Sequence, residues 1–329
     1  MQTPAATGDT RPTRAVTGDT RRTLAVMAHY DPDGLFAPHA ARNAAALAAA
    51  ADRVLVVSTA PLTDAAKAAV PPGVELVQRL NVGYDFYGWK IGLDLAGYRD
   101  YERVVICNDS YVGPLIPYQD VFAAMDTRPV DFWGMSQTRR RAHHVQSYFV
   151  AFNPWVVRSR AMERFWASMV PVSDRLEVIR RYEVGLSVSL VRAGFALGSY
   201  FEETAADARL ARARHLWWAA NSIRLRPPGK RLRAARTLPA EPWNPMSALA
   251  DRALDGARLP IVKLDTLRYD PYRLGSGDLL DKAERQYPDQ FAGVREFLLR
   301  TGSTYRPRAL ETGAHHGGPP ALVRAALGY

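Results

Sequence analysis

The sequence predicts an α/β protein built on a mostly parallel, Rossmann-like sheet with helices on both faces. Short apolar runs recur along the first third of the chain, and spans of helical character separate them. Apolar strands of four to six residues separated by helical spans indicate βαβ units, whose sheet is expected to be covered on both faces. The 47% of hydrophobic and 23% of charged residues are typical of a globular chain with a large core.

The expected elements follow one another as βα units. Apolar runs predict strands over residues 24–28, 53–59, 74–78 and 103–107, and less regular strands over 130–135 and 147–152. Helices are predicted over residues 38–51, 81–96 and 182–193. Strands that alternate with helices in this way favour a parallel sheet, because each helix returns the chain to the same edge.

The chain divides into four predicted parts. Residues 7–16 and 17–26 form an approximate ten-residue repeat rich in Thr, Gly and Arg, so residues 1–22 are predicted to be a disordered leader. Residues 23–200 are predicted to form the main domain, and residues 201–312 a basic helical extension. Residues 313–329 begin with a Gly-, His- and Pro-rich stretch and are predicted to be a flexible tail.

The net charge indicates an anionic partner. Lys and Arg number 43 against 33 Asp and Glu, a net charge of +10 that suits a phosphate, a nucleotide, a nucleic acid or an acidic membrane surface. The one cysteine, Cys107, excludes an intramolecular disulfide and a cysteine-based zinc site. No apolar run reaches the ~18 residues of a transmembrane helix, and no signal-peptide core is present, so the protein is expected in the cytoplasm.

Polar side chains follow each of the first four expected strands, where open α/β sheets bind their ligands. In strand order these residues are His29, Tyr30 and Asp31; Ser58 and Thr59; Asn81, Gly83 and Asp85; and Asn108, Asp109 and Ser110. A polar residue after one strand is most often a turn or a helix cap. Four such sets in succession predict a binding site at the carboxyl edge of the sheet.

The segment Asn108-Asp109-Ser110 has the chemistry of a clamp for a diphosphate and a divalent metal ion. A carboxylate together with carbonyl or hydroxyl oxygens can bind Mg²⁺ or Mn²⁺, which neutralises phosphate charge. Asp109 is the one carboxylate of the segment and is the predicted metal ligand. Because the segment has a single carboxylate, it could bind a metal ion weakly or bind none. If no metal ion is bound, Lys90 or arginines would supply the positive charge.

Residues 81–90, NVGYDFYGWK, allow two interpretations. The glycines permit close backbone approach to a ligand, and the aromatic rings suit a base or a sugar. The same residues fit a turn and a helix whose aromatic side chains pack on the sheet. The pair His143-His144 also suggests a metal site, but no further His or Cys lies at ligand spacing, which favours ordinary packed or solvent-facing side chains.

Glu183 is a candidate catalytic carboxylate near the start of the helix expected over residues 182–193. Alternatively, it is a first-turn acid that interacts with the helix dipole. The sequence contains no H-E-x-x-H, G-x-S-x-G, Walker A or G-x-G-x-x-G segment. Zinc peptidases, serine hydrolases, P-loop NTPases and Rossmann dehydrogenases are therefore disfavoured.

These segments resemble the rhamnan synthesis F family of polysaccharide glycosyltransferases. The matching segments are HYDPDG (29–34), VLVVST (54–59), NVGYDFYGWKIGLD (81–94), VVICNDSYVGP (104–114), DFWGM (131–135), HVQSYFVAF (144–152) and YEVGLSVSLVRAGF (182–195), with weaker matches in WNPM (243–246) and LPIVKLDTLRYDPY (259–272). They extend from residue 24 to about residue 272. The segments over 81–94 and 104–114 are long and specific, which makes chance a poor explanation.

The resemblance implies a GT-A-like fold, with residues 23–200 as the nucleotide-sugar and catalytic domain. It implies transfer of a deoxyhexose, typically rhamnose, from a nucleotide-sugar donor to a glycan acceptor by an inverting mechanism. By that comparison Asp109 would lead the metal and diphosphate contacts, and Glu183 falls where the general base of inverting enzymes lies. The other residues implied are His29, Tyr30, Asp31, Ser58 and Thr59 for the nucleoside, Lys90 and Lys263 for the leaving diphosphate, and Asp131, Trp133, His144 and Gln146 for the acceptor.

The basic run over residues 207–236 allows other functions. Its arginines, lysine and Trp217 and Trp218 suit an anionic membrane surface, where a lipid-linked acceptor would be presented, or else a solvated insertion packed on the domain. A nucleic-acid-binding protein is the rival from another class, but no helix-turn-helix, zinc-finger or RNA-recognition signature supports it, so no nucleic-acid partner is expected. A catalytically silent scaffold is the third alternative.

Overall fold

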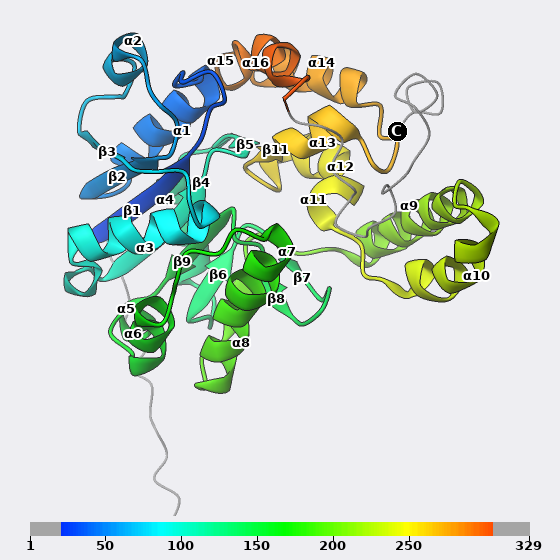
Figure 1. The fold of residues 1–329 in the computed structure, drawn as a ribbon, viewed down its shortest axis with the longest axis horizontal. Coiled ribbons are helices and arrows are strands. Elements are labelled where there is room, and N and C mark those ends of the chain that lie inside the picture. Colours follow the sequence, from blue (N-terminus) through cyan, green and yellow to red (C-terminus); the bar gives the residue numbers. More distant parts are fainter. Residues whose placement is uncertain (1–20, 305–329) are drawn as a thin grey trace, which may run out of the picture.

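A seven-stranded sheet forms the centre of the computed structural model, which describes residues 21–304 (Figure 1). Its strands are β1 (Thr23–His29), β2 (Arg53–Ser58), β3 (Val74–Gln78), β4 (Arg103–Asn108), β6 (Phe132–Gly134), β9 (Phe149–Phe152) and β10 (Leu197–Ser199). Their order is β10-β6-β9-β4-β1-β2-β3, and each runs parallel to the others except β9, which is antiparallel to β4 and β6. This confirms the predicted α/β class with a mostly parallel, Rossmann-like sheet.

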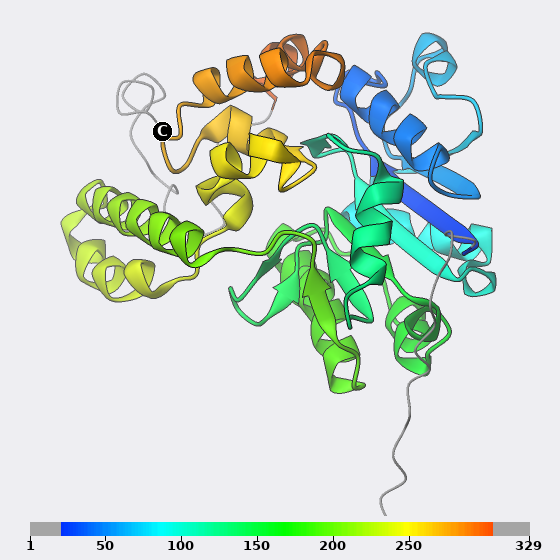
Figure 2. The ribbon, with the colours of Figure 1, turned by 180° about the vertical axis from the view of Figure 1, so that it is seen from behind.

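Helices cover both faces of the sheet. One face carries α1 (Pro38–Ala48) and α4 (Tyr118–Asp126), and Figure 2 shows α4 in front of the strands. The other face carries α3 (Tyr84–Ala96), α5 (Pro154–Val157), α6 (Arg160–Ala167), α7 (Arg175–Val178) and α8 (Val184–Arg192). In β1, Val26 packs toward α3 and Met27 toward α1, so the strand is buried on both sides. Gly92 lets α3 lie directly on the sheet, because a β-carbon there would collide with Val26.

Two short strand pairs lie outside the main sheet. β5 (Tyr111–Val112) pairs with β11 (Val262–Lys263), and β7 (Gln137–Thr138) pairs with β8 (His144–Val145). The first pair brings the C-terminal part of the chain to the end of β4. The backbone N–H of Leu264 also donates to the carbonyl of Ser110 at 3.0 Å, so a segment about 150 residues away is held beside the predicted diphosphate clamp.

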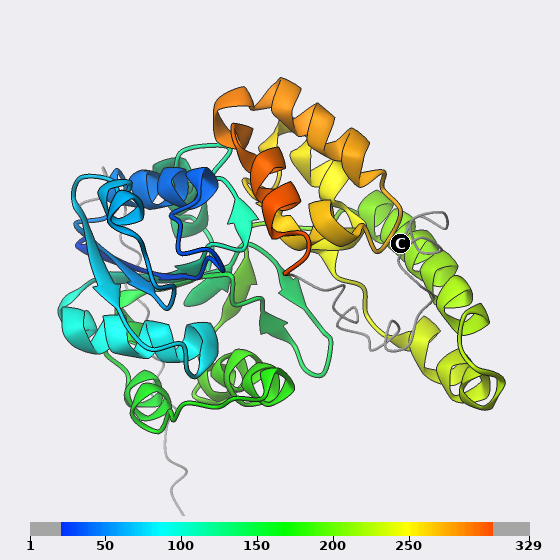
Figure 3. The ribbon, with the colours of Figure 1, turned by 45° about the horizontal axis from the view of Figure 1, so that its top comes forward.

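The C-terminal part of the described chain is helical. After β10 the chain enters α9 (Ala205–Arg224) and α10 (Pro228–Thr237), which together hold most of the basic run and project away from the sheet in Figures 1 and 3. The remaining helices are α2 (Asp64–Ala68), α11 (Pro245–Ala248), α12 (Ala250–Leu254), α13 (Leu264–Tyr269), α14 (Ser276–Gln286), α15 (Pro288–Phe291) and α16 (Val294–Thr301). Over residues 21–304 no helix is both long and apolar enough to cross a membrane. Most of the predicted leader and all of the predicted tail over 313–329 lie outside the described residues.

Two predicted helices begin elsewhere than expected. α3 begins at Tyr84 and not at residue 81, because Gly83 adopts a left-handed turn with φ of 73°. The helix predicted over 182–193 begins at Arg175 and runs through α7 and a π-helical turn, Ile179–Glu183, into α8. Glu183 therefore lies within a continuous helical run. The alternative that Glu183 acts as a first-turn acid on the helix dipole is wrong, because that effect is confined to a free N-terminal turn.

Candidate functional site

A cavity of about 390 Å³ opens at the carboxyl edge of the sheet. The predicted site residues that line it are His29, Tyr30, Thr59, Asn81, Asp85, Asn108, Asp109, Ser110, Gln146, Glu183 and Lys263. Residues that follow β1, β2, β3 and β4 thus meet in one place, as expected for ligand sites of open α/β sheets. The π-helical turn and the segment after β11 supply the opposite parts of the lining.

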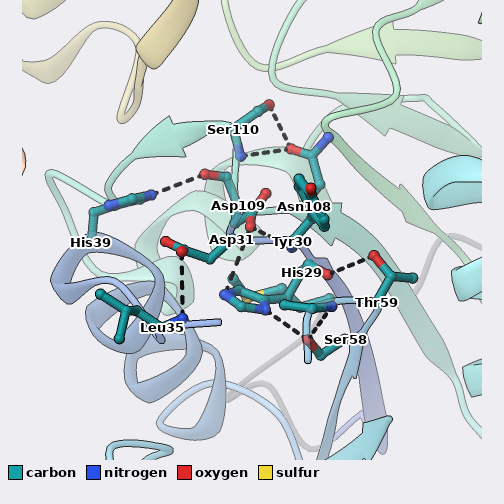
Figure 4. A network of polar contacts seen from close by, with 12 residues as sticks. His29, Tyr30, Asp31, Leu35, His39, Ser58, Thr59, Asn108, Asp109 and Ser110 are labelled. Atoms are coloured by element: carbon teal, nitrogen blue, oxygen red, sulfur yellow. Dashed lines mark hydrogen bonds and ion pairs between the residues drawn. The ribbon is translucent and has the colours of Figure 1, made fainter. Parts of the chain in front are cut away.

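Hydrogen bonds fix the segment Asn108-Asp109-Ser110 at the end of β4 (Figure 4). The Asn108 Oδ1 atom accepts from the backbone N–H and the hydroxyl of Ser110, at 3.1 and 2.7 Å. The Asp109 Oδ2 atom accepts from the backbone N–H of Tyr30 at 2.8 Å, and His39 Nε2 lies 3.1 Å from the Asp109 carbonyl oxygen. Contacts from the end of β1 and from helix α1 therefore position this segment at the end of β4.

The charge states in this region follow from its enclosed position. Burial and repulsion from Asp85 raise the pKa of Asp109 to about 8, although the Tyr30 N–H opposes the shift. Burial lowers the pKa of His29 to about 4, although Asp31 opposes the shift, and His29 Nδ1 lies 2.9 Å from Ser58 Oγ. Burial also lowers the pKa of His39 to about 3. Both histidines are therefore neutral at pH 7.

The residues present do not fit a preformed divalent metal site. Across residues 21–304, no group of three or more His, Cys, Asp or Glu side chains is arranged to hold an ion. Asp109 Oδ2 already accepts a hydrogen bond from the backbone N–H of Tyr30, and Asp109 is the one carboxylate of its segment. The prediction that Asp109 binds a metal ion is therefore not supported by further ligand side chains around it.

Positive side chains line the same cavity. They are Arg79, Arg175, Lys263 and Arg268. In the part of the chain that the structure describes, Lys263 makes no hydrogen bond or ion pair, and its Nζ atom lies 4.6 Å from the centre of the Tyr148 ring. Arg268 Nη2 donates to Thr301 Oγ1 at 2.7 Å, and Arg79 Nη2 donates to the Tyr84 carbonyl at 2.7 Å. Lys263 is thus the cation best placed to meet an anionic ligand.

Glu183 stands where the cavity meets a smaller one of about 20 Å³. Its Oε2 atom accepts from the backbone N–H of Ser147 at 3.0 Å and from the Ser147 hydroxyl, and His144 Nε2 lies 3.8 Å from Oε1. Burial opposes ionisation, but the contacts with His144 and Ser147 outweigh it and lower the pKa of Glu183 to about 2. The carboxylate is therefore ionised at pH 7. π-helical turns often occur at functional sites, where they re-aim one side chain.

Two predicted acceptor residues lie far from the cavity. Asp131 is buried just before β6, at the amino end of the parallel strands, and its carboxylate accepts from Trp155 Nε1 and the Ala196 N–H at 2.6 and 2.7 Å. Trp133 is buried in the core with ring centres 6.2 Å from Phe122 and 5.7 Å from Phe149. The structure contradicts acceptor contacts for both, because each side chain is fully used in packing. His144 and Gln146 line the smaller cavity.

Other predicted residues support the site without lining it. Both carboxylate oxygens of buried Asp31 accept from Arg300, at 3.0 and 2.6 Å, so Asp31 anchors α16 and does not face the cavity. Ser58 is buried beneath His29, and Gly83 shapes the turn before α3. Lys90 pairs with Asp94 one turn along α3, at 2.8 Å, and does not line the cavity. The prediction that Lys90 meets the diphosphate is therefore wrong in this structure.

Both interpretations of residues 81–90 hold, for different side chains. Asn81, Tyr84 and Asp85 line the cavity, whereas Trp89 is fully buried and donates to the Cys107 carbonyl at 2.6 Å. Sequence reasoning missed the lining residues Arg79, Arg175, Arg268, Tyr148 and Phe297. The segment over 259–272 offered one signal, since it holds Arg268 five positions after Lys263.

Known proteins resemble the chain in sequence and in fold. The family described as rhamnan synthesis protein F matches residues 54–227. The uncharacterized protein y4gN of Sinorhizobium fredii (strain NBRC 101917 / NGR234) is 26% identical over 132 residues, which are 38% of this chain and 34% of that protein. The chain therefore spans about a third of that relative's length.

Solved structures give weaker likenesses. The galactosyltransferase LgtC in complex with donor and acceptor sugar analogs is 11% identical, with 56% of this chain and 77% of that chain covered and a TM-score of 0.32. The 4-diphosphocytidyl-2C-methyl-D-erythritol synthase of Anaerococcus prevotii is 13% identical, with 49% and 82% covered and a TM-score of 0.33. At these scores the likenesses carry no argument about function. The sequence match does establish membership: because it covers more than half of the chain, this protein belongs to the rhamnan synthesis protein F family.

Proposed function

We propose that the protein is a glycosyltransferase that transfers a deoxyhexose, most simply rhamnose, from a nucleotide-sugar donor to a glycan acceptor. Membership of the rhamnan synthesis protein F family supports this proposal. The observation that carries it is the composition of one cavity. There, polar residues from four strand ends, a lysine from a distant segment and a half-buried carboxylate come together, and these are the groups that a nucleotide, a diphosphate and an acceptor hydroxyl require.

The donor would bind across the ends of β1 and β4. Tyr30, Thr59 and Asn81 offer hydrogen bonds and an aromatic face for the nucleoside. The diphosphate would lie against Ser110 and Lys263, which the pairing of β5 with β11 holds together. Since the residues present do not fit a metal site, the charge that develops on the leaving diphosphate would be stabilised by Lys263 and Arg268.

The acceptor hydroxyl would attack the anomeric carbon from the side of Glu183. One bond forms between the hydroxyl oxygen and that carbon, the bond to the diphosphate breaks, and the proton passes to the Glu183 carboxylate. A carboxylate with a pKa of about 2 is a weak base. It takes the proton late, when the attacking oxygen has already gained positive charge. Until then its charge orients the hydroxyl, while Ser147 and His144 hold the carboxylate in place.

The helices α9 and α10 would rest on an anionic membrane surface, in the cytoplasm, where a lipid-linked acceptor is presented. Their exposed basic residues are Arg209, Arg212, Arg224, Lys230, Arg231, Arg233 and Arg236. Leu216, Trp217 and Leu232 are exposed among them, while Trp218 is buried in the core. Basic residues interleaved with exposed apolar side chains suit the membrane interface.

A screen of nucleotide sugars tests the proposed activity. Each compound is added to the full chain in EDTA, in Mg²⁺ and in Mn²⁺, and thermal unfolding is followed. A true donor at 100 times its Kd should add about 2.7 kcal/mol to the free energy of unfolding. Compounds that stabilise the protein are then offered with glycan acceptors, and sugar transfer is measured. If no nucleotide sugar stabilises the chain in any of the three conditions, the proposal is wrong.

A further inference from the structure

The smaller cavity beside Glu183 is lined by arginines. Arg140, Arg141 and Arg175 contribute to it, together with His144 and Gln146. Gln146, Arg175 and Glu183 also line the main cavity, so the two spaces meet at the proposed base. If the donor fills the main cavity, the smaller one receives the part of the acceptor next to its reacting hydroxyl.

The arginines come from a tightly held hairpin. β7 and β8 are joined by Arg139-Arg140-Arg141-Ala142-His143. The Ala142 N–H donates to the Arg140 carbonyl at 2.9 Å, and His144 Nδ1 lies 2.8 Å from the Ala142 carbonyl oxygen and donates to it. Arg141 adopts φ of 66°, a left-handed conformation that residues with a side chain rarely adopt. The hairpin thus fixes the backbone that carries two of the three arginines.

The described lining of the smaller cavity holds three arginines and one carboxylate. Glu183 is the one acidic residue among its described lining, and it already accepts hydrogen bonds from Ser147. Outside this lining, Glu241 lies 3.7 Å from Arg140 Nη2, and its charge also interacts with Arg141. Arg141 makes no hydrogen bond or ion pair with any residue that the structure describes. An excess of guanidinium groups around a small cavity favours an anion with several acceptor oxygens, and phosphate meets that need better than a single carboxylate.

We infer that the acceptor carries a phosphate group close to the hydroxyl that receives the sugar, and that Arg140, Arg141 and Arg175 bind this phosphate. That the bound phosphate belongs to an acceptor rests on the proposed transfer reaction. Binding of phosphate by the arginines does not depend on catalysis. The phosphate belongs either to a lipid-diphosphate-linked sugar or to a soluble phosphorylated glycan. Both present the same group to the arginines.

Binding of simple phosphates to the full chain tests the site. Glucose 1-phosphate, geranyl diphosphate and, as a neutral probe, methyl glucoside are titrated calorimetrically, with the main cavity first occupied by a saturating nucleoside diphosphate. The variants are Arg141→Gln, the double variant Arg140→Gln/Arg141→Gln, and Arg139→Gln as the matched control. Arg139 lies in the same loop but does not line either cavity.

We expect both phosphates to bind and methyl glucoside not to bind. Each lost arginine should weaken phosphate binding about tenfold, the loss expected for one hydrogen bond to a charged group, while Arg139→Gln binds as the wild type does. Tighter binding of geranyl diphosphate would assign the phosphate to a lipid, and tighter binding of glucose 1-phosphate to a soluble glycan. Equal binding of methyl glucoside and glucose 1-phosphate, or unchanged binding in a folded Arg141→Gln variant, would overturn the inference. If no nucleoside diphosphate binds, the proposed function fails, and the same variants titrated without it still decide the phosphate site.

Discussion

Replacing Arg300 tests whether helix α16 is fastened to the sheet through Asp31. Asp31 is 1% exposed, and its carboxylate accepts hydrogen bonds from both Nη atoms of Arg300. Arg300→Gln leaves this buried carboxylate without its cation, a change that typically costs about 3–5 kcal/mol. Because the Arg300 side chain keeps 30% of its exposure, water offsets part of the loss, and we expect the free energy of unfolding to fall by about 2–3 kcal/mol.

The assay is urea unfolding of the full chain, with a control on the same helix. Arg295 also pairs with two carboxylates, Asp281 and Glu284, at 2.5 and 2.6 Å, but its side chain is 42% exposed. Arg295→Gln should therefore lower the free energy of unfolding much less than Arg300→Gln does, because water screens an exposed pair. The double variant Asp31→Asn/Arg300→Gln should be more stable than Arg300→Gln, because the unpaired buried charge is then gone.

The contribution of the Asp31–Arg300 pair to the free energy of unfolding depends on pH, and the pKa of Asp31 gives the direction of this dependence. Burial opposes ionisation of Asp31, but the hydrogen bonds and charge of Arg300 lower the pKa of this carboxyl below 3.8. The stabilisation is therefore present above pH ~4 and is lost as the pH falls through the folded-state pKa. Arg300→Gln should remove that acidic part of the stability profile. If Arg300→Gln unfolds at the same urea concentration as the wild type, the proposed anchor is refuted. An Asp31→Asn variant that keeps wild-type stability but no longer binds nucleotide would also refute it.

The other predictions concern catalysis, acid stability and membrane binding. Glu183→Gln should keep donor affinity and lose transfer by about 10²–10⁴-fold, because the amide cannot accept the proton; transfer at the wild-type rate would remove Glu183 as the base. Burial lowers the pKa of His29 to about 4 and that of His39 to about 3, so below pH ~6.5 both histidines bind protons in the unfolded chain only. The raised pKa of Asp109 opposes this effect with one proton, so urea unfolding should still show stability falling toward pH 4. A rise in stability over that range would contradict the neutral histidines. Co-sedimentation with vesicles should increase with anionic lipid, decrease with salt, and fall when Arg224, Arg226, Arg231 and Arg233 are changed to Ser; equal binding to neutral vesicles would exclude the membrane surface.

Local sequence patterns predicted the sheet and the half of the cavity that comes from strand ends. The strands β1, β2 and β4 are mostly apolar runs, whereas β3 also holds Glu75 and Gln78. His29 ends β1, and Thr59 and Asp109 directly follow β2 and β4. Such residues reach the same edge whatever the rest of the chain does. The other half could not be predicted in this way, because Arg268 and Phe297 reach the cavity only through tertiary contacts of the C-terminal helices.

The wrong assignments have a common physical cause. Asp131, Trp133 and Lys90 stand in segments that resemble the family, but burial or a local partner already satisfies each side chain. A sequence motif gives residue types and spacing, whereas the direction of a side chain depends on what packs against it. Asp31 shows the same effect, since its partner Arg300 lies 269 positions along the chain.

The central claim is that a nucleotide-sugar donor binds at the end of β4 and meets Lys263 without needing a metal ion. The most direct measurement is the Kd of the best nucleotide sugar in EDTA, by calorimetry, for the wild type, Lys263→Gln and Lys90→Gln. Loss of a charge-assisted hydrogen bond to phosphate should weaken binding about 10- to 100-fold in Lys263→Gln. Lys90→Gln should bind as the wild type does, because Lys90 pairs with Asp94 outside the cavity. Equal affinity of Lys263→Gln and wild type, or binding that appears only when Mg²⁺ or Mn²⁺ is added, would contradict the claim.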